Sequence, residues 1–246
     1  MVIINKKRIQ IIMACIFISL FAFSIQMSQT QNNTQRTNSS NNLVETTSTP
    51  VSGKTIVIDA GHGVPDEGAQ SSTGTTEAET NLKISLKVQN LLEQSGCTVI
   101  LTRSDENAIY DVDSNTLKQK KISDIRNRVK IGNESSADIF VSIHLNKIPQ
   151  QQYYGWQCFY SSKSEESMKL AKILQSSLNE AIQKDNKRVA MKLDTVYIMK
   201  HVEIPISIVE CGFLSNPEEE QQLLDDEYQD KLAWGIYNGI IEYFKN

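Results

Sequence analysis

The chain has 246 residues and a formal net charge of −4, which is unevenly distributed. Residues 1–53 carry four basic residues and one acidic residue, a net charge of +3, so the part from Lys54 onward carries −7. Such a charge argues against a nucleic-acid partner, because binding to phosphates needs a basic surface. The four cysteines form no CxxC pair, which excludes a cysteine-built zinc module, and the chain has only three histidines.

The first 25 residues predict a membrane-targeting segment. The basic stretch Lys6-Lys7-Arg8 precedes the apolar run 9–25, an order typical of a signal peptide or a short uncleaved anchor. A run of this length is at the lower limit for a membrane-spanning helix, and Ala22-Phe23-Ser24 is a weak cleavage site. Both alternatives stay open. We expect export in either case, to the outer face of the membrane or, after cleavage, into the surroundings.

Residues 26–52 predict a disordered polar tether. They are mainly Gln, Asn, Ser and Thr, and only Arg36 and Glu45 are charged. Such a segment cannot bury enough apolar surface to offset the entropy of ordering it. Residues 53–246 then have a length that suits one domain with its own core.

From Lys54 onward, short apolar runs alternate with segments of helical periodicity. The expected strands are Thr55–Ala60, Thr98–Thr102, Asp138–His144, Trp156–Tyr160, Val196–Met199 and Ile206–Val209. The expected helices lie around 84–92, 125–132, 168–178 and 232–244, and residues 103–123 predict a long surface loop or a partly helical insertion. This alternation predicts a single α/β domain with a mostly parallel, twisted central sheet flanked by helices.

Ionisable side chains lie at the ends of three of these strands. His62 follows the first strand, His144 ends the third, and Glu210 follows the last. A single histidine at a strand end is more often structural than functional. Because ligands and catalytic groups in open α/β sheets gather at the carboxyl ends of strands, the three together favour a site. Two imidazoles and one carboxylate are a common set of ligands for catalytic zinc.

The spacing of the acidic residues does not identify the third ligand. The candidates near the histidines are Asp59, Asp66, Glu67, Glu77, Glu79 and Glu210. Glu77 and Glu79 would lie about 200° apart on an ideal helix, so at most one of them can face a metal. The other is then an acid that compensates the dipole at the helix N-terminus.

A series of motifs resembles the zinc-dependent N-acetylmuramoyl-L-alanine amidases. The motifs are Ile56-Val57-Ile58-Asp59-Ala60-Gly61-His62-Gly63, Gly68-Ala69, Glu77 ahead of Leu82, Leu101-Thr102-Arg103, Arg128 before Asn133, Ser142-Ile143-His144-Leu145-Asn146, and Val209-Glu210-Cys211-Gly212-Phe213-Leu214-Ser215-Asn216. Their order is kept across nearly all of residues 55–243, which makes the set far more specific than any one motif. Within this family the chain is similar to the germination-specific, CwlD-type amidases of spore-forming bacteria.

The resemblance implies roles for four residues. It makes His62, Glu77 and His144 the ligands of a Zn²⁺ ion and Glu210 the catalytic glutamate. It implies hydrolysis of the amide between N-acetylmuramic acid and L-alanine in peptidoglycan, in spore cortex maturation needed for germination, at the cytoplasmic or forespore membrane. Glu210 would accept the proton of the attacking water and pass it to the departing amine.

This sequence departs from the family pattern at two positions. Gly63-Val64 stands where the family usually has two glycines, and Ala78 stands where it has a lysine. Neither change removes a ligand. Residues 104–123 match the family poorly, so the role of this loop is not assigned, and no residue is assigned to substrate binding.

Other residues are weaker candidates. We expect His201 to be a solvated loop histidine and Cys211 to be buried packing, since no histidine is placed as a base for its thiol. Arg103 and Arg128 have two interpretations, contact with peptide carboxylates or pairing with nearby aspartates. The aromatic residues Tyr153, Tyr154 and Trp156 are expected to pack in the core or at its rim rather than to stack on sugars.

Two other functions compete with the amidase interpretation, and the sequence also suggests a protein partner. The rivals are a zinc peptidase that cuts within the stem peptide and a peptidoglycan-binding protein with a decayed site. The loop before Glu77 is rich in Gly, Ser and Thr, so this ligand could be loosely held. We therefore hypothesise that an exported activator protein binds the domain and steadies the Glu77 region.

Overall fold

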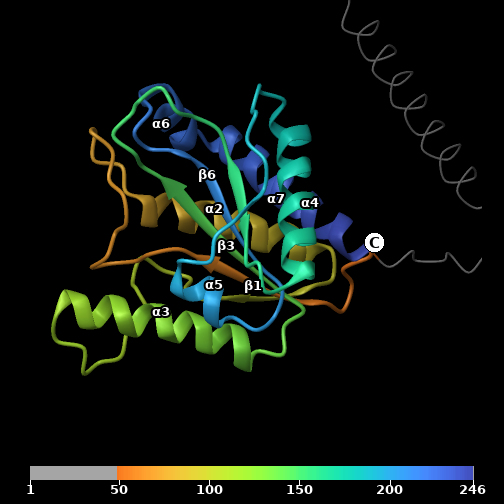
Figure 1. The fold of residues 1–246 in the computed structure, drawn as a ribbon, viewed down its shortest axis with the longest axis horizontal. Coiled ribbons are helices and arrows are strands. Elements are labelled where there is room, and N and C mark those ends of the chain that lie inside the picture. The colour runs from red at the N-terminus through yellow and green to blue at the C-terminus, as the bar shows by residue number, and fades with distance from the viewer. Residues whose placement is uncertain (1–48, 246) are drawn as a thin grey trace, which may run out of the picture. The chain divides into compact units, whose positions relative to one another are not determined.

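The computed structural model describes residues 49–245, which are drawn in colour in Figure 1. The expected leader, residues 1–25, and nearly all of the expected tether lie outside the described residues. Among residues 49–245, no helix combines the length and the apolar composition that crossing a bilayer requires.

The described part of the chain contains a six-stranded sheet. In spatial order its strands are β2 (Thr98–Leu101), β1 (Thr55–Ala60), β3 (Ile139–Asn146), β6 (Ile206–Phe213), β4 (Gln157–Tyr160) and β5 (Met191–Lys192). Neighbouring strands are parallel except β4 and β6, which are antiparallel. The predicted α/β class with a mostly parallel sheet is confirmed. Strand β1 is buried from Ile56 to Ala60, as expected for a β-branched run covered on both faces.

Helices cover both faces of the sheet (Figure 1). On one face lie α2 (Glu77–Gln94), α4 (Glu165–Ile182), α7 (Asp226–Lys245) and the shorter α6 (Pro217–Leu224). On the other face lie α3 (Leu117–Glu134) and α5 (Tyr197–His201). Each layer of helices closes its own apolar core against the sheet, and the core under α2, α4 and α7 also includes the fully buried Val51.

Local capping explains where several helices begin. Thr76 accepts a hydrogen bond from the amide of Glu79 at the start of α2, and Thr116 forms a capping box with Gln119 at the start of α3. Asn216 caps α6, with Pro217 in the first turn. The helix predicted around residues 125–132 therefore begins earlier, at Leu117, and the loop before it ends at Thr116.

One predicted strand is wrong. Residues 196–199 contribute to the short helix α5 rather than to a strand. In a strand, the adjacent side chains of Ile198 and Met199 would point to opposite faces, but both belong to the core beside α3. A short apolar run does not distinguish the two conformations by periodicity. Strand β5 and helix α6 were not predicted.

Candidate metal centre

His62 lies in the loop that leaves β1 at the carboxyl edge of the sheet. Its backbone has φ 61°, in the left-handed region. The imidazole lies between two acids, with Nδ1 3.4 Å from Asp66 Oδ2 and Nε2 3.3 Å from Glu77 Oε1. Burial alone would lower the pKa of His62, but hydrogen bonds and charge from Asp66 and Glu77 outweigh it and raise this pKa to about 9.

Glu77 is the first residue of α2 and lies at the centre of the cluster. Its Oε1 is 2.9 Å from His144 Nδ1 and accepts the amide of Leu145 at 3.1 Å, while Oε2 accepts the amide of Ala69 at 2.8 Å. Burial alone would raise the pKa of Glu77, but hydrogen bonds from His144 and His62 hold it well below its usual value. Glu77 is therefore a fixed anion between two imidazoles.

Two glycines make room for this cluster. A Cβ on Gly61 would lie 2.3 Å from the ring of His144. Gly68 has φ +70°, and a Cβ there would lie 2.6 Å from Glu77 Oε2 and 2.7 Å from the His62 ring. No larger residue fits at either position without moving the side chains of the cluster. Close packing against the cluster thus explains why the Gly61-His62 and Gly68-Ala69 motifs contain glycine.

The three side chains together form a donor set suited to a metal. One potential ligand atom each from His62, Glu77 and His144 lies within 4.8 Å of the other two, and the imidazole rings meet edge to face with centroids 5.1 Å apart. Two nitrogen donors and one carboxylate oxygen form the ligand set of many catalytic zinc sites. The residues fit a Zn²⁺ ion in type, number and convergence.

Glu210 lies beside this cluster on β6, in register with His144 on β3. Its Oε2 is buried and has no hydrogen-bond partner among the described residues. Burial raises the pKa of Glu210 to about 7; the charge of His144 opposes this rise, and that of Glu77 adds to it. An unpartnered buried carboxylate oxygen is costly for folding. Its position beside the cluster of His62, Glu77 and His144 makes Glu210 a candidate catalytic residue.

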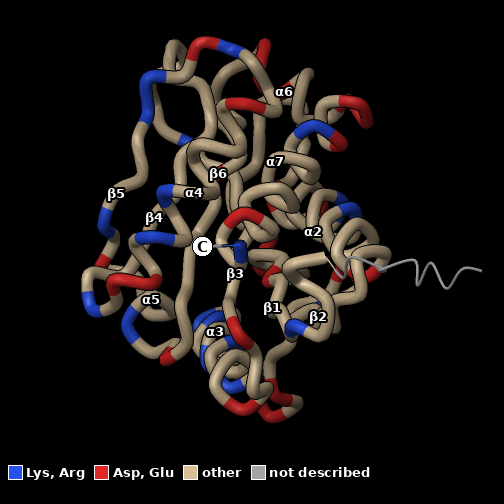
Figure 2. Tube along the Cα trace, turned by 90° about the vertical axis from the view of Figure 1, so that its right-hand side faces the viewer, with Lys and Arg blue, Asp and Glu red and all other residues tan. Residues whose placement is uncertain are grey.

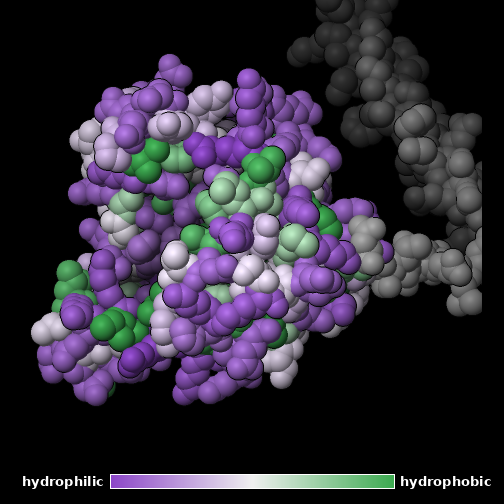
Figure 3. All heavy atoms as spheres, viewed as in Figure 1, coloured by the Kyte–Doolittle hydropathy of each residue, from purple (hydrophilic) through white to green (hydrophobic). Residues whose placement is uncertain are grey.

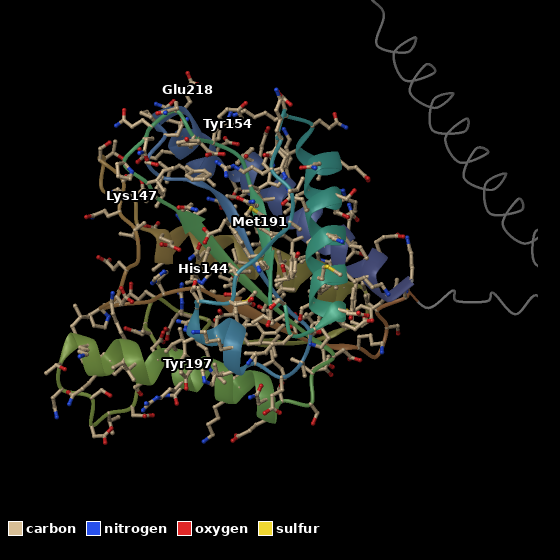
Figure 4. The ribbon with its side chains drawn as sticks, in the orientation of Figure 1. His144, Lys147, Tyr154, Met191, Tyr197 and Glu218 are labelled. Atoms are coloured by element: carbon tan, nitrogen blue, oxygen red, sulfur yellow. The ribbon has the colours of Figure 1, made fainter. Side chains whose placement is uncertain are left out.

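A cavity of about 380 Å³ opens over His62, His144 and Glu210. Its far wall is apolar and consists of Ile125, Leu193, Val196, Ile198 and Ile208. Figure 3 shows the surface hollowed between the part over α3 and the upper loops, and in Figure 4 His144 lies at the level of this hollow. The site therefore has a charged floor and an apolar side.

The other acids proposed from the sequence have different partners. Asp59 accepts hydrogen bonds from Arg128, Ser142 and Thr102. Glu79 is exposed and pairs with Lys83 at 2.7 Å, so only Glu77 of the two glutamates faces the site, as predicted. Glu67 is also exposed. Asp66 contacts His62 and is 2.8 Å from Lys121.

Arg103 and Arg128 are buried beneath the His62 loop. Arg103 donates to the carbonyls of Ala60, Gly61, Ala78 and Asp105. Arg128 pairs with Asp59 and Asp124 and donates to the carbonyls of Ala60 and His62. The expected pairing with an aspartate is confirmed for Arg128, which pairs with Asp124. It is wrong for Arg103, which contacts the backbone carbonyl of Asp105 and not its carboxylate.

The weaker candidates lie apart from the cluster. His201 is exposed on α5, where its ring stacks on Tyr197 at 3.9 Å. Cys211 is buried, and burial raises the pKa of its thiol well above the usual value. Trp156 is fully buried, whereas Tyr153 and Tyr154 remain 45% and 39% exposed.

One set of supporting residues gave no signal in the sequence. Glu220 on α6 accepts hydrogen bonds from the hydroxyls of Thr73 and Thr75, in the loop that leads to Glu77. Lys147 donates to the carbonyl of Gln70 in the same loop at 2.5 Å. We call the two hydrogen bonds from Thr73 and Thr75 to Glu220 the Glu220 brace. The two threonines are about 145 residues from Glu220 in the chain, so no local sequence pattern could reveal it.

Comparisons with known proteins agree with the motifs. Residues 56–242 match the family model described as N-acetylmuramoyl-L-alanine amidase. The germination-specific N-acetylmuramoyl-L-alanine amidase of Bacillus subtilis is 39% identical over 197 residues, which cover 80% of this chain and 82% of that protein.

Solved structures give the same result. The CwlD amidase from Clostridioides difficile, solved in complex with the GerS lipoprotein, is 43% identical, with a TM-score of 0.76 over 78% of this chain and 99% of that chain. An N-acetylmuramoyl-L-alanine amidase from Clostridium difficile 630 is 31% identical, with a TM-score of 0.70 over 79% of this chain and 98% of that chain.

Proposed function

The chain belongs to the N-acetylmuramoyl-L-alanine amidase family, and from this membership we propose that it hydrolyses the amide between N-acetylmuramic acid and L-alanine with one Zn²⁺ ion. The proposed ligands are His62, Glu77 and His144. The convergence of two imidazoles on one buried carboxylate supports this assignment. When bound, the ion supplies positive charge that lowers the pKa of water toward ~7 and polarises a carbonyl.

Glu210 is the proposed catalytic residue. The single observation that carries this role is its buried Oε2, which lies beside the cluster and accepts no hydrogen bond from the described part of the chain. That oxygen is free to accept the proton of an attacking water. The same carboxyl group can then protonate the departing amine of L-alanine, because burial raises the pKa of Glu210 and so favours a group that both accepts and releases a proton near neutral pH.

The remaining residues of the site position the ligands and shape the cavity. The amides of Ala69 and Leu145 donate hydrogen bonds to the two carboxylate oxygens of Glu77. Asp66 contacts Nδ1 of His62, the ring nitrogen that faces away from Glu77, and so orients the imidazole. The apolar wall around Leu193 and Ile198 keeps water away from one side of the cavity. Substrate therefore enters a site whose polar groups are already placed.

Metal content and reaction products test this proposal together. His144→Ala is expected to lose bound zinc and hydrolysis, whereas Glu210→Gln should keep zinc and lose hydrolysis. The matched control is Glu79→Gln, which removes an exposed acid two residues from Glu77 and should change neither. Full zinc content and activity in His144→Ala would show that the ligand assignment is wrong.

Product analysis separates the rival functions. Digestion of purified peptidoglycan should release peptides with an L-alanine amino terminus and leave lactyl-bearing muramic acid, and a chelator should stop the reaction. New amino termini within the stem peptide would indicate a zinc peptidase instead. Binding of peptidoglycan without any cleavage would indicate a decayed site.

The biological setting is also part of this proposal. One relative is named as germination-specific, and another was solved in complex with a lipoprotein. We propose a role in spore cortex maturation, with residues 1–25 as a leader or anchor, a tether that ends before residue 49, and the remainder as the exported catalytic domain at the outer face of the cytoplasmic or forespore membrane. The boundary expected between residues 52 and 53 moves toward the N-terminus, because Val51 is buried in the core of the domain. We also propose an exported activator that improves zinc retention. Tight zinc binding and rapid cleavage by the purified protein alone would remove the need for such a partner.

A further inference from the structure

Arg188 is held in a fixed orientation between α4 and β5. Its Nε donates to the carbonyl of Tyr154 at 3.0 Å, and its Nη1 donates to Gln157 Oε1 at 3.1 Å. Its Cζ lies 4.5 Å from the centre of the Phe213 ring and 5.9 Å from that of Tyr153. The guanidinium is thus clamped by two hydrogen bonds and two rings.

Among residues 49–245, no acid forms an ion pair with this guanidinium. None of the ion pairs among residues 49–245 includes Arg188. Glu219 interacts with its charge at longer range, but the oxygens of Glu219 already accept the amides of Gly155 and Phe213, both at 2.7 Å. No hydrogen bond occupies Arg188 Nη2 within the described structure. An oriented guanidinium with free N–H groups matches the geometry of a carboxylate.

A row of residues across the sheet connects Arg188 to the catalytic site. His144 on β3 is in register with Glu210 on β6, which is in register with Gln157 on β4. Side chains in register on neighbouring strands point to the same face, and neighbouring strands lie about 4.8 Å apart. Gln157 is one strand spacing from Glu210. Because Arg188 contacts the far end of the Gln157 side chain, its guanidinium lies on the order of 10 Å from Glu210.

Arg188 also lines its own cavity, of about 360 Å³, which we call the Arg188 pocket. The exposed rings of Tyr153 and Tyr154 contribute to its wall, and the Lys184 ammonium lies 5.1 Å from the centre of the Tyr154 ring. In Figure 4, the labels place Tyr154 above His144, on the loops at the carboxyl edge of the sheet. Lys187 and Arg188 line the pocket together with one acid, Asp185, so it combines aromatic walls with an excess of positive charge.

The charge of the surrounding surface favours an anionic ligand. Residues 163–200 contain eight basic and five acidic residues. Residues 201–246 contain two basic and ten acidic residues. Figure 2 shows blue segments along the sheet edge formed by β4 and β5. On a domain with a charge of −7, this edge is locally basic.

We propose that the Arg188 pocket binds a carboxylate of the acidic stem peptide, so that Arg188 is a substrate-binding residue. This inference rests on the proposed amidase function. An extended peptide advances at most ~3.6 Å per residue, so a carboxylate about three residues beyond the scissile amide reaches roughly 10 Å, the separation of Arg188 from Glu210. The pocket would select acidic stems and fix the peptide across Gln157.

Kinetics on paired substrates test this assignment. The substrates are a muropeptide with free stem carboxylates and the same muropeptide with those carboxylates amidated. With the free acid, Arg188→Gln should raise KM by about 10- to 100-fold with little change in kcat, the size expected for a lost charge-assisted hydrogen bond. With the amidated substrate, the wild type and Arg188→Gln should have similar KM values.

Control variants keep the test independent of folding. Lys172→Gln removes one exposed positive charge from α4, outside the pocket, and should leave both KM values unchanged. Arg188→Lys keeps the positive charge but lacks the two parallel N–H donors of the guanidinium. Its affinity for the free acid should therefore lie between those of Arg188→Gln and the wild type. Unchanged KM in Arg188→Gln, or an equal loss on both substrates, would overturn the proposal, since an equal loss would be the mark of structural damage or of glycan contact.

A binding measurement separates failure of this inference from failure of the proposed function. Calorimetry with the free tripeptide L-alanyl-γ-D-glutamyl-diaminopimelate measures affinity without hydrolysis. Wild-type protein should bind it more tightly than Arg188→Gln. If the wild type cleaves no muropeptide but shows this difference, the amidase assignment fails and the carboxylate site stands. If the wild type cleaves both substrates and shows no difference, only the carboxylate site fails.

Discussion

Arg128 Nη1 lies 2.6 Å from Asp59 Oδ1, in the interior below the loop that carries His62. Both side chains are almost completely buried. Arg128 also donates to the carbonyl of His62, while Asp59 on β1 is in register with Ser142 on β3 and accepts a hydrogen bond from its hydroxyl. The pair therefore ties α3 and two strands to the backbone of one proposed metal ligand.

Breaking this pair should destabilise the whole domain. We expect Arg128→Gln to lower the free energy of unfolding by about 3–5 kcal/mol, because it leaves the Asp59 carboxylate buried without its cation. Urea unfolding followed by circular dichroism measures the loss. Arg126→Gln removes an exposed arginine from the same helix and should change stability by less than about 0.5 kcal/mol. Equal stability of the two variants would contradict this account.

The same pair predicts a loss of stability in acid. Burial alone would raise the pKa of Asp59, but Arg128 and the hydroxyls of Ser142 and Thr102 hold it below its usual value of 3.8. A carboxyl group with a lowered pKa contributes stability above its unfolded pKa and loses it as pH falls through the folded pKa. Asp59→Asn lacks this contribution, so the stability difference between wild type and variant should shrink as pH falls below about 4. A difference that stays constant between pH 7 and pH 3 would be evidence against this role.

The strands that carry the site could be predicted from the sequence because their physical causes are local. Strands β1, β3 and β6 are β-branched apolar runs. They bring His62, His144 and Glu210, respectively, to the carboxyl edge of the sheet. Strand β5 has only two residues, too few for any periodicity. Helix α5 has a single turn whose two buried residues are adjacent, a pattern that a strand can also produce.

The candidate site could be predicted only in part for a similar reason. His62, His144 and Glu210 follow from the positions of strand ends, but the role of Glu77 depended on a resemblance. Glu77 begins a helix and is fixed by the amides of Ala69 and Leu145, contacts that exist only in the folded chain. The positions of Arg188 and Glu220 were not predicted, since both act through residues far from them in sequence.

The loop before Glu77 depends on the Glu220 brace. Because Glu220 accepts hydrogen bonds from both Thr73 and Thr75, Glu220→Ala should free the loop and speed the loss of zinc to a chelator several-fold. The loop lies at the surface, so the thermal midpoint should change little. Glu218→Ala, on the same helix and exposed, is the matched control. An unchanged rate of zinc loss in Glu220→Ala would show that the loop holds Glu77 without this brace.

Val51 anchors the first described residues in the core of the domain. Its side chain is fully buried in the core under α2 and α7, and its carbonyl accepts hydrogen bonds from the amide of Lys54 and the thiol of Cys97. A protein beginning at residue 53 should therefore be less stable than one beginning at residue 49 by about 1.5–3 kcal/mol, the value of one buried valine. Val51→Ala in the longer form isolates the side chain and should show part of this loss. Thermal and urea unfolding of the three proteins provide the measurement, and identical stability of the two lengths would mean that the core does not depend on Val51.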